Sequence, residues 1–257
     1  MNGPALRLGA YIGVLAALLA AERICPFAPG EQGKTRRIAF HLALGAANTV
    51  ALGFTVGPLA YAAADRAASW GLAAILGLDG AQEIAATVVA FDLWDYWMHL
   101  ANHKVGFLWR FHRAHHSDME MDVTTASRFH IGELILSGVS KILMILLWGP
   151  SLWGLVAFEA LLTAASQFHH ANLNIPFRVQ DAVEKVVVTP RMHRCHHSLH
   201  GACFNHNFST VLSVWDRVFR SYHRARQAEE LRPIGLFGPR GPSTMELRPF
   251  LLTPLGR

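Results

Sequence analysis

Charged residues are scarce in this chain of 257 residues: Asp, Glu, Lys and Arg together make up 16% of the sequence, whereas about 25% is usual in soluble domains. Hydrophobic residues make up 52%. This composition argues against an ordinary soluble enzyme. The formal net charge is +5, but Lys and Arg lie mainly in segments that flank apolar stretches, where positive charge sets membrane orientation. We therefore expect a membrane protein with no nucleic-acid partner.

Cysteine is also scarce, with Cys25, Cys195 and Cys203 as the whole set. An odd number without paired zinc-ribbon spacing argues against a disulfide framework, and the place of Cys195 between metal-type histidines favours a reducing compartment. The sequence has no glycine-rich phosphate loop and no visible haem-binding or flavin-binding domain. At the N-terminus the apolar run continues to about Ala21, which predicts a membrane anchor rather than a cleaved signal peptide.

Long apolar runs are what the sequence does contain. Roughly 20 apolar residues span a bilayer as a helix, and four stretches come near that length or exceed it: 6–21, 38–60, 82–100 and 132–170. Gly149, Pro150 and Ser151 interrupt the last stretch and predict a helical hairpin, because proline breaks helices. Segment 67–78 is apolar but too short to cross. We expect an all-α integral membrane bundle of about four spans, the last a hairpin.

Positive charge in two loops sets the expected orientation of this bundle. Loops 22–37 and 101–131 carry several Lys and Arg residues and belong on the cytoplasmic side by the positive-inside rule. This multi-pass topology, in the inner membrane if the protein is bacterial, predicts a histidine-rich helical cap on the cytoplasmic side. We divide the chain into membrane anchor helices at 1–81, a catalytic domain at 82–225 and a cytoplasmic tail at 226–257.

Histidine is abundant: ten of the fifteen histidines fall into four tight groups. Spacings of three and four residues bring side chains to one face of a helix. Ten imidazoles are more than one ion can use, which predicts two neighbouring sites and thus a dinuclear centre. Imidazole suits iron, zinc, copper and nickel. The candidate ligands are His99, His103, His112, His115, His116, His169, His170, His193, His196 and His197.

The pattern His-x-x-His-His occurs twice, at 112–116 and at 193–197, and such a repeat is hard to produce by chance. Asp92 and Asp95 share a helical face with the first histidine pair, and carboxylates there can accept the second ring N–H of a ligating histidine. Asn172 is a further candidate for such a supporting catalytic role. For Glu133, an ion pair with Arg128 is as well supported as a part in catalysis.

Five strings, in order from Asp92 to Tyr222, carry a resemblance: DLWDYWMHLANH, WRFHRAHHS, TTASRFH, HHANL and MHRCHHSLHGACFNHNFSTVLSVWDRVFRSY. They resemble the fatty acid hydroxylase and sterol desaturase superfamily of integral membrane di-iron enzymes. The resemblance implies two iron ions, with at least one ligand from the HHANL string. The other eight ligands that it implies are His99, His103, His112, His115, His116, His193, His196 and His197. It further implies O2 as co-substrate, hydroxylation or desaturation of a fatty acyl chain or sterol, and an external cytochrome, ferredoxin or reductase. Asn207, Phe208 and Ser209 depart from the family's usual Asn-Tyr-Gly.

Three other readings of the histidines remain open. A membrane hydrolase with two zinc ions could use similar ligands to activate water, and it would work without O2 or reductant. A metal transporter or sensor predicts ionisable ligands along the bundle midplane, where this chain has mostly Ala, Leu, Val and Gly. A structural zinc site needs about four ligands, and ten histidines exceed that. Zinc can also replace iron in purified protein, because these ligands select weakly between the two metals.

Overall fold

The computed structural model describes residues 3–29, 33–199, 201–226, 233–236 and 245–256. Within these ranges every named secondary-structure element is a helix, and β pairing is limited to isolated bridges such as Pro26 with Leu173. The all-α expectation is confirmed. The tail expected at 226–257 includes 227–232, 237–244 and 257, which lie outside the described residues.

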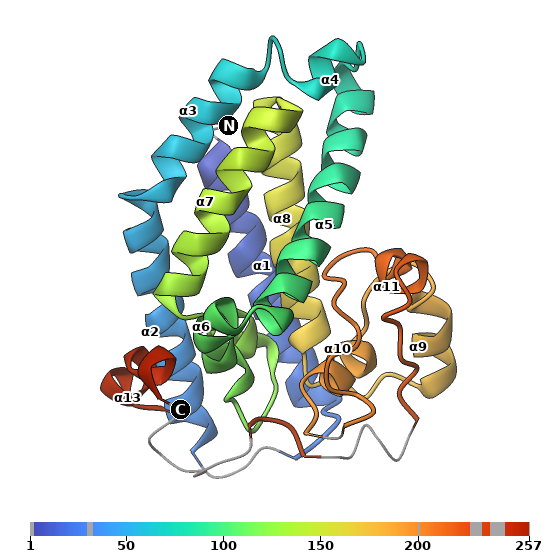
Figure 1. The fold of residues 1–257 in the computed structure, drawn as a ribbon. Helices are drawn as coiled ribbons and strands as arrows, with labels where there is room; N and C mark the ends of the chain where they lie inside the picture. The colour runs from blue at the N-terminus through green and yellow to red at the C-terminus, as the bar shows by residue number, and fades with distance from the viewer. Residues whose placement is uncertain (1–2, 30–32, 200, 227–232, 237–244, 257) are drawn as a thin grey trace.

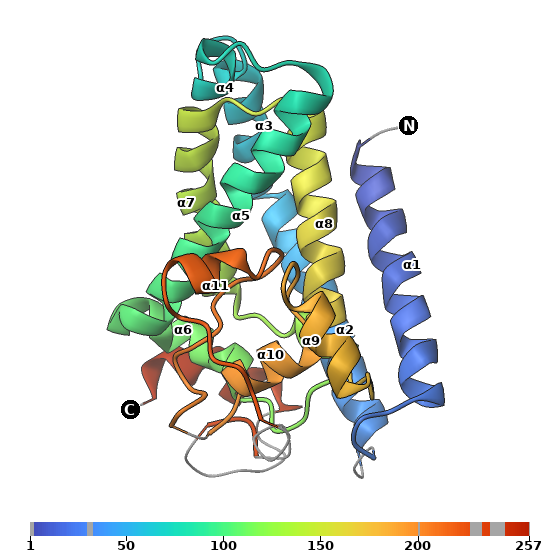
Figure 2. The same ribbon diagram turned by 90° about the vertical axis from the view of Figure 1, so that its right-hand side faces the viewer.

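Six helices build an elongated bundle (Figures 1 and 2). They are α1 (Gly3–Ile24), α2 (Lys34–Gly53), α3 (Val56–Ala67), α5 (Gly80–Lys104), α7 (Ile131–Trp148) and α8 (Leu152–His170). The short helix α4 (Leu72–Ile75) lies at one end of the bundle, within the apolar segment that is too short to span. The core between α3, α5, α7 and α8 consists of Ala63, Ala64, Phe91, Ile145, Leu155 and Phe158.

The hairpin predicted at 132–170 is present as α7 and α8. The break falls at Gly149, which has a φ of 68° and ends α7 in the left-handed conformation that glycine adopts readily. A Cβ at this position would lie 2.5 Å from the carbonyl oxygen of Ala67, so the close approach of the α7–α8 turn to the end of α3 also requires glycine. Ser151 then caps α8 by accepting a hydrogen bond from the Gly154 N–H at 2.9 Å.

Stretch 38–60, expected as one span, is bent. Helix α2 ends at Gly53 and α3 begins at Val56, and Thr55 between them has φ −122° and ψ −102°, outside the helical region. Among the described residues, α7 is long and apolar enough to cross a membrane by itself, and α2 with 56–75 qualifies as a pair bent by 49°. Length and composition therefore support one or two spans among the described residues, and the number of about four stays a prediction.

A cap of shorter helices covers the end of the bundle opposite α4 (Figure 2). It comprises α6 (Gly106–His116), the 3-10 helix η1 (Val123–Ser127), α9 (Phe177–Val183), α10 (Pro190–His196) and α11 (Val214–Val218). Near the C-terminus, α13 (Leu247–Leu251) and the 3-10 helix η3 (Thr253–Leu255) dock on this cap. The Arg113 guanidinium on α6 donates to the Thr253 carbonyl from Nε at 3.1 Å.

Side chains at the starts of the cap helices fix where each begins. Asp122 accepts from the Thr124 N–H at 2.8 Å to start η1, and Thr189 accepts from the Met192 N–H at 3.3 Å to start α10. His130 starts α7, where its Nδ1 accepts from a backbone N–H at 3.0 Å. His130 is therefore a hydrogen-bonded residue that caps α7 and lies outside the predicted ligand set.

Candidate metal centre

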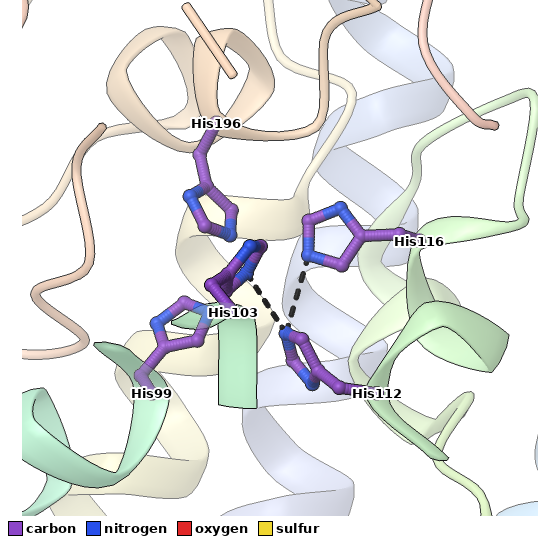
Figure 3. A group of neighbouring side chains, drawn as sticks. All are labelled: His99, His103, His112, His116 and His196. Atoms are coloured by element: carbon purple, nitrogen blue, oxygen red, sulfur yellow. Dashed lines mark hydrogen bonds between the residues drawn. The ribbon is translucent and has the colours of Figure 1, made fainter. Parts of the chain in front are cut away.

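Nine of the ten predicted ligands converge in two buried groups at the junction of bundle and cap. Within each group, one ring nitrogen of every member lies within 4.8 Å of one ring nitrogen of every other member. The five-histidine group, drawn in Figure 3, consists of His99, His103, His112, His116 and His196. The four-histidine group consists of His115, His170, His193 and His197. Each group has enough donors for one metal ion.

The two His-x-x-His-His motifs divide between the groups in opposite ways. On α6, His112 and His116 enter the five-histidine group and His115 enters the four-histidine group. In the motif at α10, His193 and His197 belong to the four-histidine group, and His196 belongs to the five-histidine group. Residues four apart share a helical face, whereas their neighbour in the motif points elsewhere. The groups are adjacent, because the rings of His116 and His197 stack with centroids 4.2 Å apart.

Acceptor-only partners fix the tautomers in the five-histidine group. The Nδ1–H of His99 donates to the Phe208 carbonyl at 2.8 Å, and that of His196 donates to a backbone carbonyl at 2.8 Å. The Nδ1–H of His112 donates to Glu133 Oε1 at 2.7 Å. A neutral imidazole carries one N–H, so each Nε2 is left with a lone pair. This arrangement is typical of metal-ligating histidines.

The four-histidine group passes a sharper test of fit. The Nδ1–H of His115 donates to the Arg128 carbonyl at 3.2 Å, and that of His170 donates to a carbonyl of its own helix at 2.7 Å. Both Nε2 atoms therefore lack hydrogen, yet they lie 3.1 Å apart. No hydrogen is available to join two lone pairs at this distance. A cation between them satisfies both, so the donor set fits a metal ion.

Burial keeps these imidazoles neutral, as metal ligation requires. Burial lowers the pKa of His193 and His197 well below the usual value of a histidine, and neighbouring imidazoles lower it further. For His196, burial lowers the pKa to about 3, although the carbonyl bond on Nδ1 acts in the opposite direction. The Nε2 of His196 is buried without a hydrogen-bond partner among the described residues, which leaves its lone pair available.

His169, the tenth predicted ligand, lies outside both groups. Its Nδ1–H donates to the Thr210 carbonyl at 3.2 Å, and its ring lies against His193 with a centroid distance of 4.0 Å. Of the two histidines in the HHANL string, His170 belongs to the four-histidine group, and His169 lies next to that group against the ring of His193. Ligation by His169 stays a prediction.

Asp92 and Asp95 support the segment behind the ligands. Asp92 accepts from the Leu212 N–H at 3.0 Å and from the Trp215 indole at 2.7 Å. Asp95 accepts from the Thr210 hydroxyl at 2.7 Å. Among the hydrogen bonds of the described residues, neither carboxylate binds a histidine. The two carboxylates thus hold the segment that begins at Thr210, whose carbonyl accepts from His169. A catalytic role for them stays a prediction.

Asn172 connects the end of α8 to the loop after α1. Its side-chain amide donates to the Ala28 carbonyl at 2.9 Å and its Oδ1 accepts from the Ala28 N–H at 3.0 Å. Its backbone N–H donates to Glu22 at 2.8 Å. These contacts join the end of α8 to the loop after α1, and a supporting catalytic role for Asn172 stays a prediction.

Glu133 contacts a predicted ligand, and the sequence analysis did not single it out for this contact. The sequence left an ion pair with Arg128 and a part in catalysis as equal alternatives for Glu133, which is 5% exposed and accepts from His112. A second contact comes from the Asn102 amide at 3.4 Å. The available signal was an acidic residue in the first turn of an otherwise apolar helix, where a buried charge requires a partner.

Known proteins with similar sequences are lipid oxygenases by name. The chain is 26% identical to human alkylglycerol monooxygenase over 151 residues, which is 58% of this chain and 33% of the relative. It is 31% identical to the ornithine lipid hydroxylase OlsE of Rhizobium tropici over 147 residues, 55% of this chain and 42% of the relative. It is 26% identical to human cholesterol 25-hydroxylase over 144 residues, 54% of this chain and 50% of the relative.

These alignments span about a third to a half of each relative's length. No solved structure matches the chain significantly. The match to the fatty acid hydroxylase family covers residues 84–221, which is 138 of the 257 residues and includes all ten predicted ligands. The chain therefore belongs to the fatty acid hydroxylase family.

Proposed function

We propose that this protein is a membrane-bound oxygenase that uses a dinuclear non-haem iron centre, O2 and external electrons to hydroxylate or desaturate a C–H bond of a lipid. The observation that carries the proposal is the pair of adjacent histidine groups, buried at the junction of bundle and cap. Nine imidazoles in two adjacent groups are more than a hydrolytic triad or a contact between helices requires. They fit two metal ions.

The nine histidines of the two groups would hold the ions, one ion in each group, with His169 as the candidate for a tenth ligand. When bound, two iron ions supply the redox chemistry that O2 activation and C–H oxidation require. The chain's own residues orient the ligands and exclude water. Backbone carbonyls fix the rings of His99, His115, His170 and His196 through their Nδ1–H groups.

Glu133 would supply negative charge beside the centre once metal ions are bound. Its carboxylate accepts from His112 and raises the basicity of that ligand. The centre is otherwise lined by neutral imidazoles, so a buried carboxylate stabilises the added positive charge. Zinc in place of iron would bind the same donors, and a di-zinc hydrolase would differ by working without O2 and reductant.

A lipid substrate is proposed from the relatives and from the bundle. The relatives' names specify alkylglycerol, ornithine lipid and cholesterol, which share an amphiphilic character. On α7, Val139, Leu143 and Leu147 are each at least half exposed, and such a row suits contact with lipid. We place the histidine cap on the cytoplasmic side of a bundle with about four spans. An external cytochrome, ferredoxin or reductase would deliver the electrons.

The test compares His196→Ala with His130→Asn in full-length protein purified anaerobically after iron enrichment. Asn caps helices well, so the control retains the role of His130. Wild type and the control should bind two iron ions by mass spectrometry and Mössbauer spectroscopy. When a reductase system is present, they should also transfer label from isotopic O2 to a hydroxylated lipid of the host extract or, if the reaction is a desaturation, to water as a C=C bond forms.

His196→Ala should lose iron and labelling with its helical circular dichroism unchanged. Full turnover by His196→Ala contradicts the assignment. Activity on lipid esters with two zinc ions and no O2 would instead support the hydrolase.

A further inference from the structure

A third cluster of metal-ligating side chains lies beside the histidine groups. The Sγ atoms of Cys195 and Cys203 and one ring nitrogen of His223 all lie within 4.8 Å of one another. Both cysteines are fully buried and are not joined by a disulfide. The members come from α10, the loop after it and the segment after α11, so three separate parts of the chain converge on one point.

The backbone around this cluster is held in place by a tight turn. The His206 N–H donates to the Cys203 carbonyl at 3.2 Å, and Asn205 within the turn has a φ of 66°. Asn207, with a φ of 60°, accepts from the His223 N–H at 2.8 Å and donates to the His223 carbonyl at 3.0 Å. Two residues in the left-handed region cost free energy, so other contacts must stabilise this arrangement.

His206 stands next to the cluster. Its ring centroid is 5.5 Å from that of His223, and its Nδ1 is buried without a hydrogen-bond partner among the described residues. The spacing Cys203-x-x-His206 around a turn presents two donor side chains from one short loop. Together the four side chains offer two thiols and two imidazoles, a donor set that tetrahedral zinc prefers.

We propose that Cys195, Cys203 and His223 bind a zinc ion, with His206 as the fourth ligand, in a structural site separate from the two histidine groups. The thiols give up their protons to solvent as the metal binds. Soft thiolate donors favour zinc over the hard divalent cations. The catalytic proposal uses neither cysteine, and the two histidine groups contain nitrogen donors alone.

The position of this site gives it a role in the cap. Cys195 immediately precedes His196 of the five-histidine group, and the carbonyl of His206 accepts the Nδ1–H of His196 at 2.8 Å. A zinc ion would therefore immobilise both the helix that carries His196 and the loop that orients its ring. It would stabilise the position of His196 in the five-histidine group.

The experiment measures zinc–sulfur scattering by X-ray absorption at the zinc edge, using full-length reduced protein loaded with zinc in detergent. A sulfur shell at about 2.3 Å is distinct from histidine nitrogen at about 2.0–2.1 Å. We expect this shell in wild type, its loss in Cys203→Ser and its retention in Cys25→Ser, the control for the exposed third cysteine. His116→Ala, which damages the five-histidine group, should also retain it.

That last variant separates this site from the proposed function, because iron loading can fail while zinc–sulfur scattering persists. A wild-type protein that binds zinc through nitrogen alone overturns the site. Recovery of Cys195 and Cys203 as a disulfide from the zinc-loaded protein overturns it as well. Both results come from the wild type and do not require Cys203→Ser to fold.

Discussion

Removing the Glu133 carboxylate is the most informative single perturbation of the centre. Glu133 lies at the start of α7, is 5% exposed, and accepts the Nδ1–H of His112 at 2.7 Å. His112 in turn lies 3.2 Å, nitrogen to nitrogen, from both His103 and His116 (Figure 3). The carboxylate thus fixes the ring that lies at the middle of three ligands.

The expected cost follows from the type of hydrogen bond. A bond to a charged group contributes about 1.5–3 kcal/mol, which corresponds to roughly 10- to 100-fold in affinity, the range for residues that support metal ligands. Glu133→Ala should weaken metal binding by this factor. In Glu133→Gln a neutral acceptor retains about half of the bond energy, so the expected loss is roughly 3- to 10-fold.

The assay is anaerobic competition for ferrous iron between the protein and a chelator, followed by lipid turnover with a reductase system. Glu159→Gln is the matched control, because this second carboxylate of the hairpin contacts Lys141 at 3.5 Å and lies outside both histidine groups. The order of affinity should be wild type and control, then Gln, then Ala. Equal affinity of Glu133→Ala and wild type would refute the reasoning.

Three further outcomes are expected in detergent-solubilised protein. Asp92→Asn loses one of two acceptor oxygens that hold two backbone N–H groups and an indole N–H, so unfolding should become easier by about 1–3 kcal/mol; an unchanged Tm contradicts this. Gly154→Ala puts a Cβ 2.8 Å from Glu83 Oε1 and should lower the Tm through overpacking of about 1–3 kcal/mol, whereas Gly13→Ala, with open space around it, should not. In metal-free protein, burial lowers the pKa of His196 to about 3, while the unfolded chain binds this proton below about pH 6.5. The free energy of unfolding should therefore decrease as pH falls below about 6.5, by about 1 kcal/mol per pH unit from this residue. Denaturant titrations at several pH values, with chelator present, measure this free energy, and a value that does not change with pH contradicts the prediction.

Local periodicity accounts for what the sequence predicted well. The stretch expected at 82–100 is α5 (Gly80–Lys104), and the break expected at Gly149 is the turn between α7 and α8. Helix content depends on neighbours within about four residues, so a hydrophobic pattern and a proline suffice to locate it. The bend near Thr55 was missed although Gly53 and Pro58 flank it, because the apolar run across 38–60 was given more weight than these two helix breakers.

Contacts between distant segments account for the rest. His99 donates to a carbonyl 109 residues later in the chain, and His112 donates to a carboxylate 21 residues later. Nothing in the local pattern of either histidine specifies its acceptor. The motifs identified the ligand types, but the division of each motif between two groups depends on how α6 faces α10, which is a property of the tertiary structure.

That division has a consequence for how the centre assembles. Each His-x-x-His-His motif gives two rings to one group and one ring to the other, so neither group is complete unless α6 and α10 are both docked. Helix α5 completes the five-histidine group and α8 completes the four-histidine group, which connects the cap to two bundle helices. Loss of either group leaves lone pairs buried without a cation, at a cost for each unpaired polar atom. Because all four helices serve both the binding of metal and the closure of the cap, occupancy of one group should favour docking of the helices that build the other.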